Sequence, residues 1–273
     1  APRQQLRTRN TVLGVAWLVG VAVLSLGVPA WSLTRLLLES QRSELDIGEL
    51  VGAVVGSVSS SILGAALALL LALPIAALAA RYRSRIVRSI EGAAFLGHAL
   101  PGVVVGLSLV FLTLAVLPAA YQTLAVLAFA YAVLFLPKAI GSSRSAIAHV
   151  PPGLESTARS LGRGPLRAWC TVTGRLAWPG IAAGTLLVVL TAMKELPATL
   201  MLRPTGFSTL ATELWSRTEI EAFGSAAPYA LTMIILASVP AWLMGRWLAR
   251  SPETATGIDR VDDEMVRTDE VAY

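Results

Sequence analysis

Two adjacent charged side chains stand inside an apolar stretch of this sequence. Lys194 and Glu195 interrupt the run 176–202, and Pro197 follows them closely. A charge at the centre of a bilayer costs on the order of 2.5–3.5 kcal/mol, so such residues usually face a bundle interior. Proline removes a backbone hydrogen bond, which predicts a helix break here. Two interpretations stay open for the three residues: a translocation path or gate, or structural ion pairs between helices.

The same pair bears on a second class of protein. Neighbours in a helix point about 100° apart, so Lys194 and Glu195 are expected to have separate partners. They are also the available buried titratable groups that an ion-coupled secondary carrier could use. A carrier of that kind stays an alternative.

A cluster of hydroxyl groups offers nucleophilic chemistry. Ser142, Ser143 and Ser145 lie shortly before His149. A serine hydrolase needs its nucleophile and base within hydrogen-bond reach, and no G-x-S-x-G turn occurs around these serines. An intramembrane hydrolase is therefore kept only as another alternative.

Other chemistries lack their residues. Neither lysine, Lys138 or Lys194, belongs to a G-x-x-x-x-G-K-[ST] sequence, so the chain has no P-loop with which to hydrolyse ATP. The single cysteine, Cys170, cannot form an internal disulfide, and the two histidines, His98 and His149, do not have zinc-site spacing. We expect no metal and no cofactor bound by this chain.

The composition predicts that these residues are positioned by membrane helices. Of 273 residues, 55% are hydrophobic and 14% are charged, and the mean hydropathy is +0.67. A soluble domain carries about 25% charged residues, so an ordinary soluble protein is excluded. The net charge of +5 does not indicate nucleic-acid binding, because the basic residues lie between long uncharged runs rather than on a soluble module.

Apolar runs predict an all-α membrane protein with six transmembrane helices, because about 20 apolar residues cross the bilayer as a helix. One run is long enough to cross twice with a turn at Pro118. The runs are 11–34, 50–80, 92–137, 176–202 and 222–245. Most of the 22 Lys and Arg residues fall on one side, and short cytoplasmic loops hold an excess of them. Both termini are therefore expected in the cytoplasm.

Three segments follow from this reading. A six-helix domain occupies 11–250, between a cytoplasmic N-terminal segment or linker at 1–10 and an acidic tail at 251–273, which we expect to be disordered and cytoplasmic. Small residues at four-residue spacing let membrane helices approach closely. The second run contains such a stripe, which predicts a helix-packing face: Gly52, Gly56, Ser60 and Gly64.

The cytoplasmic loop 138–177 is far longer than a connection between two helices requires. After a Pro-Pro-Gly breaker, Leu154, Ala158 and Leu161 share one face of a short helix. Glycines at 162 and 164 interrupt it, and Pro165 suits the first position of a second helix. Two short amphipathic helices on the membrane surface are suited to docking into a partner's groove.

Residues 154–162, followed by Val-Thr at 172–173 and Pro-Gly-Ile at 179–181, resemble the EAA motif of permease subunits of binding-protein-dependent type I ABC importers. In that family this loop is the coupling helix that inserts into the ATPase subunit. The family's acidic residue falls on Ser156, and Glu155 stands one place earlier. The resemblance implies an ATPase-coupling loop within 154–173, with Glu155 as the ionic contact, that includes Glu155, Ser156, Ala158, Leu161, Gly162 and Pro165.

A second stretch is similar to ferric-iron permeases. Residues 193–204, then Gly-Phe at 206–207 and Thr-Leu-Ala-Thr at 209–212, resemble the fifth helix and outer loop of the second half of those proteins. They usually join two six-helix halves in one chain. The resemblance therefore implies either the C-terminal half of a fused permease or a separate half-size subunit.

The two resemblances together imply a multi-pass permease of the bacterial inner membrane and its partners. These would be a cytoplasmic ABC ATPase dimer that carries ATP and magnesium, a second permease half, and a periplasmic or lipid-anchored binding protein. Membrane lipid would surround the chain, with no nucleic acid involved. Ferric iron is the expected substrate, and related permeases for thiamine, polyamines or phosphonates leave alternatives open.

Overall fold

The computed structural model describes residues 8–39, 46–82 and 84–250, and every regular element in these ranges is a helix. Helix α1 (Thr8–Glu39) begins slightly before the expected first span, and the expected acidic tail lies outside the described residues. The chain divides into two units, 1–235 and 236–273. Of the second unit, the structure describes the last part of α11 (Phe223–Arg250).

Five helical segments in the described ranges are long and apolar enough to cross a membrane. They belong to α1, to α2 (Ile47–Arg81), to α5 (Leu124–Ala148), to a continuous helical segment at 165–192, and to α11. These segments account for all but one of the expected crossings.

The remaining crossing is divided. Helix α3 (Arg85–Leu96) has no buried residue, and a 3-10 turn, η2 (Gly97–Ala99), separates it from α4 (Gly102–Val116). Proline 101 precedes α4, whose 15 residues make a helix about 23 Å long, shorter than the ~30 Å hydrocarbon layer. The turn expected at Pro118 is confirmed as a second 3-10 turn, η3 (Pro118–Ala120), before α5.

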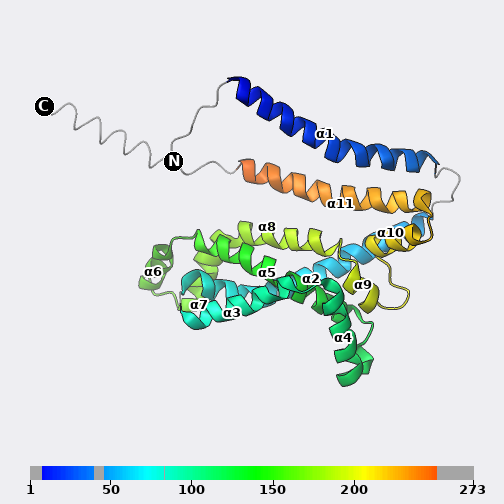
Figure 1. The fold of residues 1–273 in the computed structure, drawn as a ribbon. Coiled ribbons are helices and arrows are strands. Elements are labelled where there is room, and N and C mark those ends of the chain that lie inside the picture. The colour runs from blue at the N-terminus through cyan, green and yellow to red at the C-terminus, as the bar shows by residue number, and fades with distance from the viewer. Residues whose placement is uncertain (1–7, 40–45, 83, 251–273) are drawn as a thin grey trace. The chain divides into compact units, whose positions relative to one another are not determined.

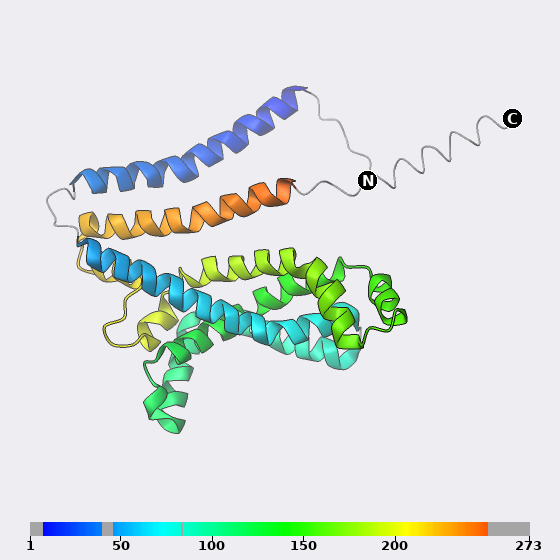
Figure 2. The ribbon, with the colours of Figure 1, turned by 180° about the vertical axis from the view of Figure 1, so that it is seen from behind.

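Helices α2, α5 and α8 (Arg175–Ala192) lie alongside one another and form the core of the first unit (Figures 1 and 2). Their contact surfaces consist largely of small residues, so the backbones approach closely. A methyl group on Gly64 would lie 2.5 Å from Cβ of Tyr131, and one on Gly184 would overlap Ser142. The fully buried alanines of α2 on this side are Ala53, Ala65, Ala68, Ala72 and Ala76.

The small-residue stripe of α2 packs closely over only part of its length. Ser60 is buried, Gly64 contacts Tyr131, and a methyl group on Gly56 would overlap the carbonyl oxygen of Ser208. Gly52 differs from the expectation, because no atom lies within 4 Å of a methyl group placed there. The stripe therefore packs against neighbours from residue 56 onward, and its first glycine leaves open space.

Short helices mark the two ends of the first unit. Helices α6 (Pro152–Ser160) and α7 (Pro165–Ala168) lie at one end, which we call the α6 end, and α9 (Pro197–Leu202) and α10 (Leu210–Glu219) lie at the opposite α10 end (Figures 1 and 2).

Candidate functional site

The helix breaks between α8 and α9, where the sequence predicts a break. Residues 193–194 form a turn and 195–196 have no regular structure, and the carboxylate of Glu195 accepts hydrogen bonds from the backbone N–H groups of Ala198 and Thr199, both at 3.1 Å. The Thr199 hydroxyl lies 3.0 Å from the same carboxylate. The first N–H groups of a helix have no partner within it. Glu195 therefore caps α9.

Further contacts hold the Glu195 carboxylate in place. The hydroxyl groups of Tyr131 on α5 and Thr199 lie 2.7 Å apart and are buried. A methyl group on Gly102, at the start of α4, would lie 2.6 Å from Oε1 of Glu195. Lys194, by contrast, is exposed, and no ion pair joins it to Glu195 within the described ranges. The structural role of Glu195 is that of a helix cap.

A pocket of about 630 Å³ opens at the α10 end. Five segments line it: the start of α2, the turn before α5, α9, the loop from α9 to α10, and α10 itself. The loop contributes an arginine, a threonine and backbone, and α2 and α10 contribute one carboxylate each. The lining residues used below are Glu49, Gly52, Gln122, Arg203, Thr205 and Glu213.

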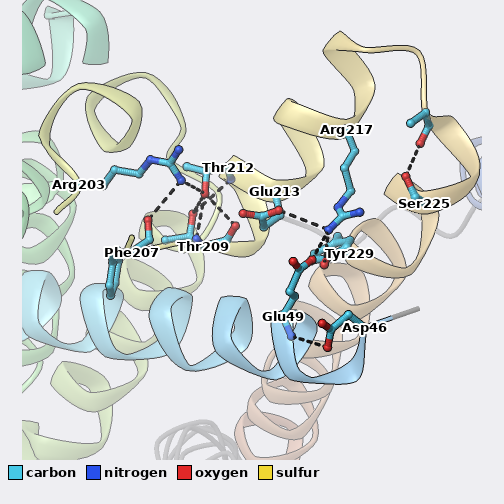
Figure 3. A network of polar contacts seen from close by, with 11 residues as sticks. Asp46, Glu49, Arg203, Phe207, Thr209, Thr212, Glu213, Arg217, Ser225 and Tyr229 are labelled. Atoms are coloured by element: carbon cyan, nitrogen blue, oxygen red, sulfur yellow. Dashed lines mark hydrogen bonds and ion pairs between the residues drawn. The ribbon is translucent and has the colours of Figure 1, made fainter. Parts of the chain in front are cut away.

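One arginine joins three segments beside this pocket (Figure 3). Arg217 Nη2 lies 2.7 Å from the carboxylate of Glu49 and 2.9 Å from the Tyr229 hydroxyl, and its guanidinium lies over the Tyr229 ring at 4.5 Å. It also pairs with Glu213 at 3.6 Å. The two carboxylates of the pocket wall therefore share one counter-charge, which fixes the start of α2 to α10 and to the first residues of α11.

The loop at the α6 end differs in part from the expectation. Helix α6 forms as predicted, and Gly162 adopts φ +84°, a conformation that glycine tolerates best. The second short helix is not separate: α7 continues through a π-helical turn, η4 (Trp169–Gly174), directly into α8. The expected apolar face of α6 is only partly buried, because Ala158 is buried whereas Leu154 and Leu161 are exposed.

The carboxylate of Glu155 points into the protein. Its side chain is 14% exposed and binds the guanidinium of Arg159 at 2.7 Å and the hydroxyl of Thr173 at 3.1 Å. Nη2 of Arg81, the last residue of α2, lies 3.9 Å away. Ser156, where the EAA resemblance sets the acidic residue, is exposed, and its hydroxyl donates to the carbonyl oxygen of Gly153.

Sequence reasoning missed four partners in these two networks. Tyr131 and Thr199 lie beside Glu195, and Arg81 and Thr173 lie beside Glu155. Thr199 follows Glu195 by one helical turn, a spacing at which side chains meet. The other three are distant in the chain from the acid they accompany, and only their polarity within apolar segments could have drawn attention to them.

The hydrolase alternative has no supporting geometry in the described part of the chain. Nδ1 of His149 lies 2.7 Å from the carbonyl oxygen of Ser145, and the hydroxyl of Ser142 donates to the carbonyl oxygen of Lys138. No serine hydroxyl is hydrogen-bonded to His149 among these residues, and Ser143 is fully buried. No group of three or more His, Cys, Asp or Glu side chains in the same ranges could hold a metal ion.

Comparisons with known proteins agree with one another. Residues 72–251 match the family model described as binding-protein-dependent transport system inner membrane component. The chain is 36% identical over 229 residues to the Fe(3+)-transport system permease protein FbpB 2 of Haemophilus influenzae, covering 83% of this chain and 45% of that protein. It is 29% identical over 131 residues to the molybdenum transport system permease protein ModB of Escherichia coli, covering 47% of this chain and 57% of that protein. The chain thus spans about half the length of the curated relatives it matches.

Solved structures share the fold. The MetNI methionine ABC transporter in an inward-facing conformation matches with a TM-score of 0.62 at 16% identity, covering 76% of this chain and 98% of that one. A bacterial ABC transporter that imports the acidic polysaccharide alginate matches with a TM-score of 0.61 at 13% identity, covering 90% and 97%. The similarity extends over nearly the whole of each solved chain.

Proposed function

The chain belongs to the family of binding-protein-dependent transport system inner membrane components of bacteria, and from that premise we propose that it forms half of the translocation path of a ferric-iron importer. The observation that carries the proposal is the 36% identity to an Fe(3+)-transport permease across 83% of the chain. An ABC importer moves substrate by switching access between the two sides of the membrane, driven by ATPase subunits.

The distribution of basic residues supports an orientation with the α6 end in the cytoplasm. Arg81 and Arg159 lie at that end, together with Arg163, whereas Arg203 and Arg217 lie at the α10 end. The excess of positive charge in short cytoplasmic loops sets the orientation of membrane proteins. In this orientation both termini are cytoplasmic, and the pocket of about 630 Å³ faces the periplasm.

We assign the path to the broken helix and the pocket. Substrate leaves its binding protein at the α10 end, where Glu49 and Glu213 line the pocket, and passes the break at Lys194, Glu195 and Pro197. Glu195 holds α9 through its first N–H groups, so the break is built into the folded state. Irregular backbone at membrane depth is tolerated where protein buries it or it lines a water-filled cavity.

The ATPase-coupling loop at 154–173 would connect this path to its energy source. It includes Glu155, Ser156, Ala158, Leu161, Gly162 and Pro165. The loop projects from the bundle at the α6 end, and Leu161 is 79% exposed, which suits contact with a partner. ATP and magnesium would be bound by that partner, because this chain has no P-loop.

Two further partners complete the assembly. The curated iron relative is about twice as long as the matched region, which supports a second permease half, either in the same polypeptide or as a second copy. A solved alginate transporter is described in complex with a pentasaccharide-bound periplasmic protein. A periplasmic or lipid-anchored binding protein is proposed here by analogy, and it would set most of the substrate specificity.

Uptake of radioactive ferric iron by a strain that lacks this chain tests the proposal. The wild-type chain should restore uptake, and a chain without residues 156–162 should not, although it reaches the membrane. Thiamine, polyamine, phosphonate and molybdenum uptake are measured alongside. Restoration of another substrate instead of iron refutes the substrate assignment. Import by the loop deletion, or import driven by an ion gradient without ATP, refutes the proposed coupling to an ATPase.

A further inference from the structure

The loop at the α6 end presents a surface of one charge sign. Between residues 150 and 175 the sequence contains a single acidic residue, Glu155, and its carboxylate is turned inward. The outward side chains are exposed arginines and leucines. The residues that form this surface, which we call the docking face, are Leu154, Leu161, Leu166, Arg163 and Arg167.

The leucines of the docking face are exposed to an extent that is unusual for a soluble surface. Leu161 and Leu166 are 79% and 76% exposed, and Leu154 is 46% exposed. They belong to α6, to the turn that follows it and to α7, and of these α6 projects from the bundle (Figure 1). Apolar groups rimmed by charge mark a contact with another protein or with a membrane.

Contacts behind the docking face explain why Glu155 is unavailable to a partner. Nη1 of Arg81 donates to the carbonyl oxygen of Val150 at 3.0 Å, and Nη2 lies 3.5 Å from the Thr173 hydroxyl and 3.9 Å from Glu155. Thr173 is fully buried and donates to Glu155 at 3.1 Å. One carboxylate and one guanidinium thus connect four segments: the end of α2, the end of α5, α6 and the π-helical turn.

If the Glu155 carboxylate turned outward, the positive charge of Arg81 would lose its nearby counter-charge. The side chain of Arg81 is only 17% exposed, and its Nε is buried without a hydrogen-bond partner in the described part of the chain. Removing one member of a buried charge pair leaves the other desolvated and unpaired, which is strongly unfavourable. The inward position of Glu155 is therefore the stable one. We call the pair Arg81 and Glu155 the internal clamp.

Resting on the proposed function, in which this loop docks into an ATPase, we propose that Glu155 acts within the internal clamp and does not contact the ATPase, and that the groove that meets the docking face has an apolar floor and an acidic rim. The partner's acidic groups meet Arg163 and Arg167, and its apolar floor receives Leu161 and Leu166. Displacement of α6 by the ATPase then reaches α2 directly through Arg81.

The internal clamp is tested in the complete importer, reconstituted with its own ATPase and binding protein. The variants are Arg81→Gln, Glu155→Gln and their combination. Each single variant should retain the ATPase within about twofold and hydrolyse ATP, while import falls by about tenfold. The double variant should import no less than the more impaired single variant, because the two residues act as one unit.

A different pattern would overturn the clamp. If Glu155→Gln loses the ATPase by about tenfold whereas Arg81→Gln retains it, Glu155 is a docking contact, as the family resemblance implies. Import by the double variant that falls well below that of either single variant, with the ATPase retained, also refutes the pairing.

The docking face is tested by charge reversal and by apolar truncation. Leu161→Ser, and Arg163→Glu combined with Arg167→Glu, should each lower ATPase retention by about tenfold or more. The matched control is Arg85→Glu, an exposed arginine at the same end but on α3, which should retain the ATPase. Full retention in the loop variants overturns the docking face.

Lipid headgroups are the competing partner for exposed arginines. The same variants are therefore compared in nanodiscs of phosphatidylcholine and in nanodiscs that contain phosphatidylglycerol. Loss of the ATPase in both lipids supports a protein groove, and loss confined to the anionic lipid refutes it. If the wild-type chain retains no ATPase at all, the proposed function itself fails, which is a different result from a failure of the variants.

Discussion

Replacement of Glu195 by alanine is the most direct test of the broken helix. The carboxylate accepts hydrogen bonds from two backbone N–H groups and one hydroxyl in the first turn of α9. Alanine removes this acceptor and leaves the N–H groups of Ala198 and Thr199 without it. Backbone groups left unsatisfied at membrane depth cost several kcal/mol.

The magnitude follows from these contacts. Loss of a helix cap costs about 0.5–2 kcal/mol, and a hydrogen bond to a charged group contributes about 1.5–3 kcal/mol net. Relief from burying the charge of a half-exposed carboxylate offsets part of this loss. We expect Glu195→Ala to lower the free energy of unfolding by about 2 kcal/mol, and Glu195→Gln, which keeps one acceptor oxygen, by about half as much.

Thermal unfolding of the detergent-solubilised chain measures this loss, and the adjacent Lys194→Ala is the matched control. The Lys194 side chain is exposed, so its truncation should change stability by no more than about 0.5 kcal/mol. Glu195→Ala should unfold several degrees lower, and import by the complete transporter should fall with it. Equal melting temperatures for the two alanine variants would refute the capping role.

Two further substitutions probe helix packing. Gly64→Ala forces a methyl group to 2.5 Å from Cβ of Tyr131 and should lower the free energy of unfolding by about 1–3 kcal/mol. Its control, Gly52→Ala, places a methyl group in open space and should cost nothing. Equal losses of stability in the two variants would contradict the close approach of α2 and α5. Ser57→Ala removes the buried hydroxyl that accepts a hydrogen bond from the Leu210 N–H at 2.7 Å, and it should lower the free energy of unfolding by about 1–3 kcal/mol. An unchanged melting temperature would show that water or another group replaces the hydroxyl.

The membrane helices were predictable because lipid imposes their length and composition. A run of about 20 apolar residues has few alternatives to a transmembrane helix, and proline at 118 and 197 stands at the first position of a new short helix, where its N–H would have no partner. The division of the third crossing was not predictable from hydropathy. Residues 92–116 contain no Asp, Glu, Lys or Arg, and the 3-10 turn before Pro101, which contains His98, interrupts them without a change in formal charge.

The sequence did not predict which way the side chains of the loop point. Helical spacing correctly predicts α6, but it cannot tell whether Glu155 faces a partner protein or its own bundle. That direction is decided by Arg81 and Thr173, which are distant in the chain and are brought together by helix packing. The continuity of α7 with α8 also escaped prediction, because the π-helical turn contains no residue that marks it.

Helix α2 reaches from the internal clamp to the pocket as one continuous helix of 35 residues, about 52 Å long. Gly64, which contacts Tyr131 of α5, lies about 26 Å along the axis from Arg81 and about 23 Å from Glu49. Buried alanines accompany the helix along most of this length, and close-packed interiors transmit strain. The residue that meets the coupling loop and the residue that lines the pocket therefore belong to the same piece of backbone.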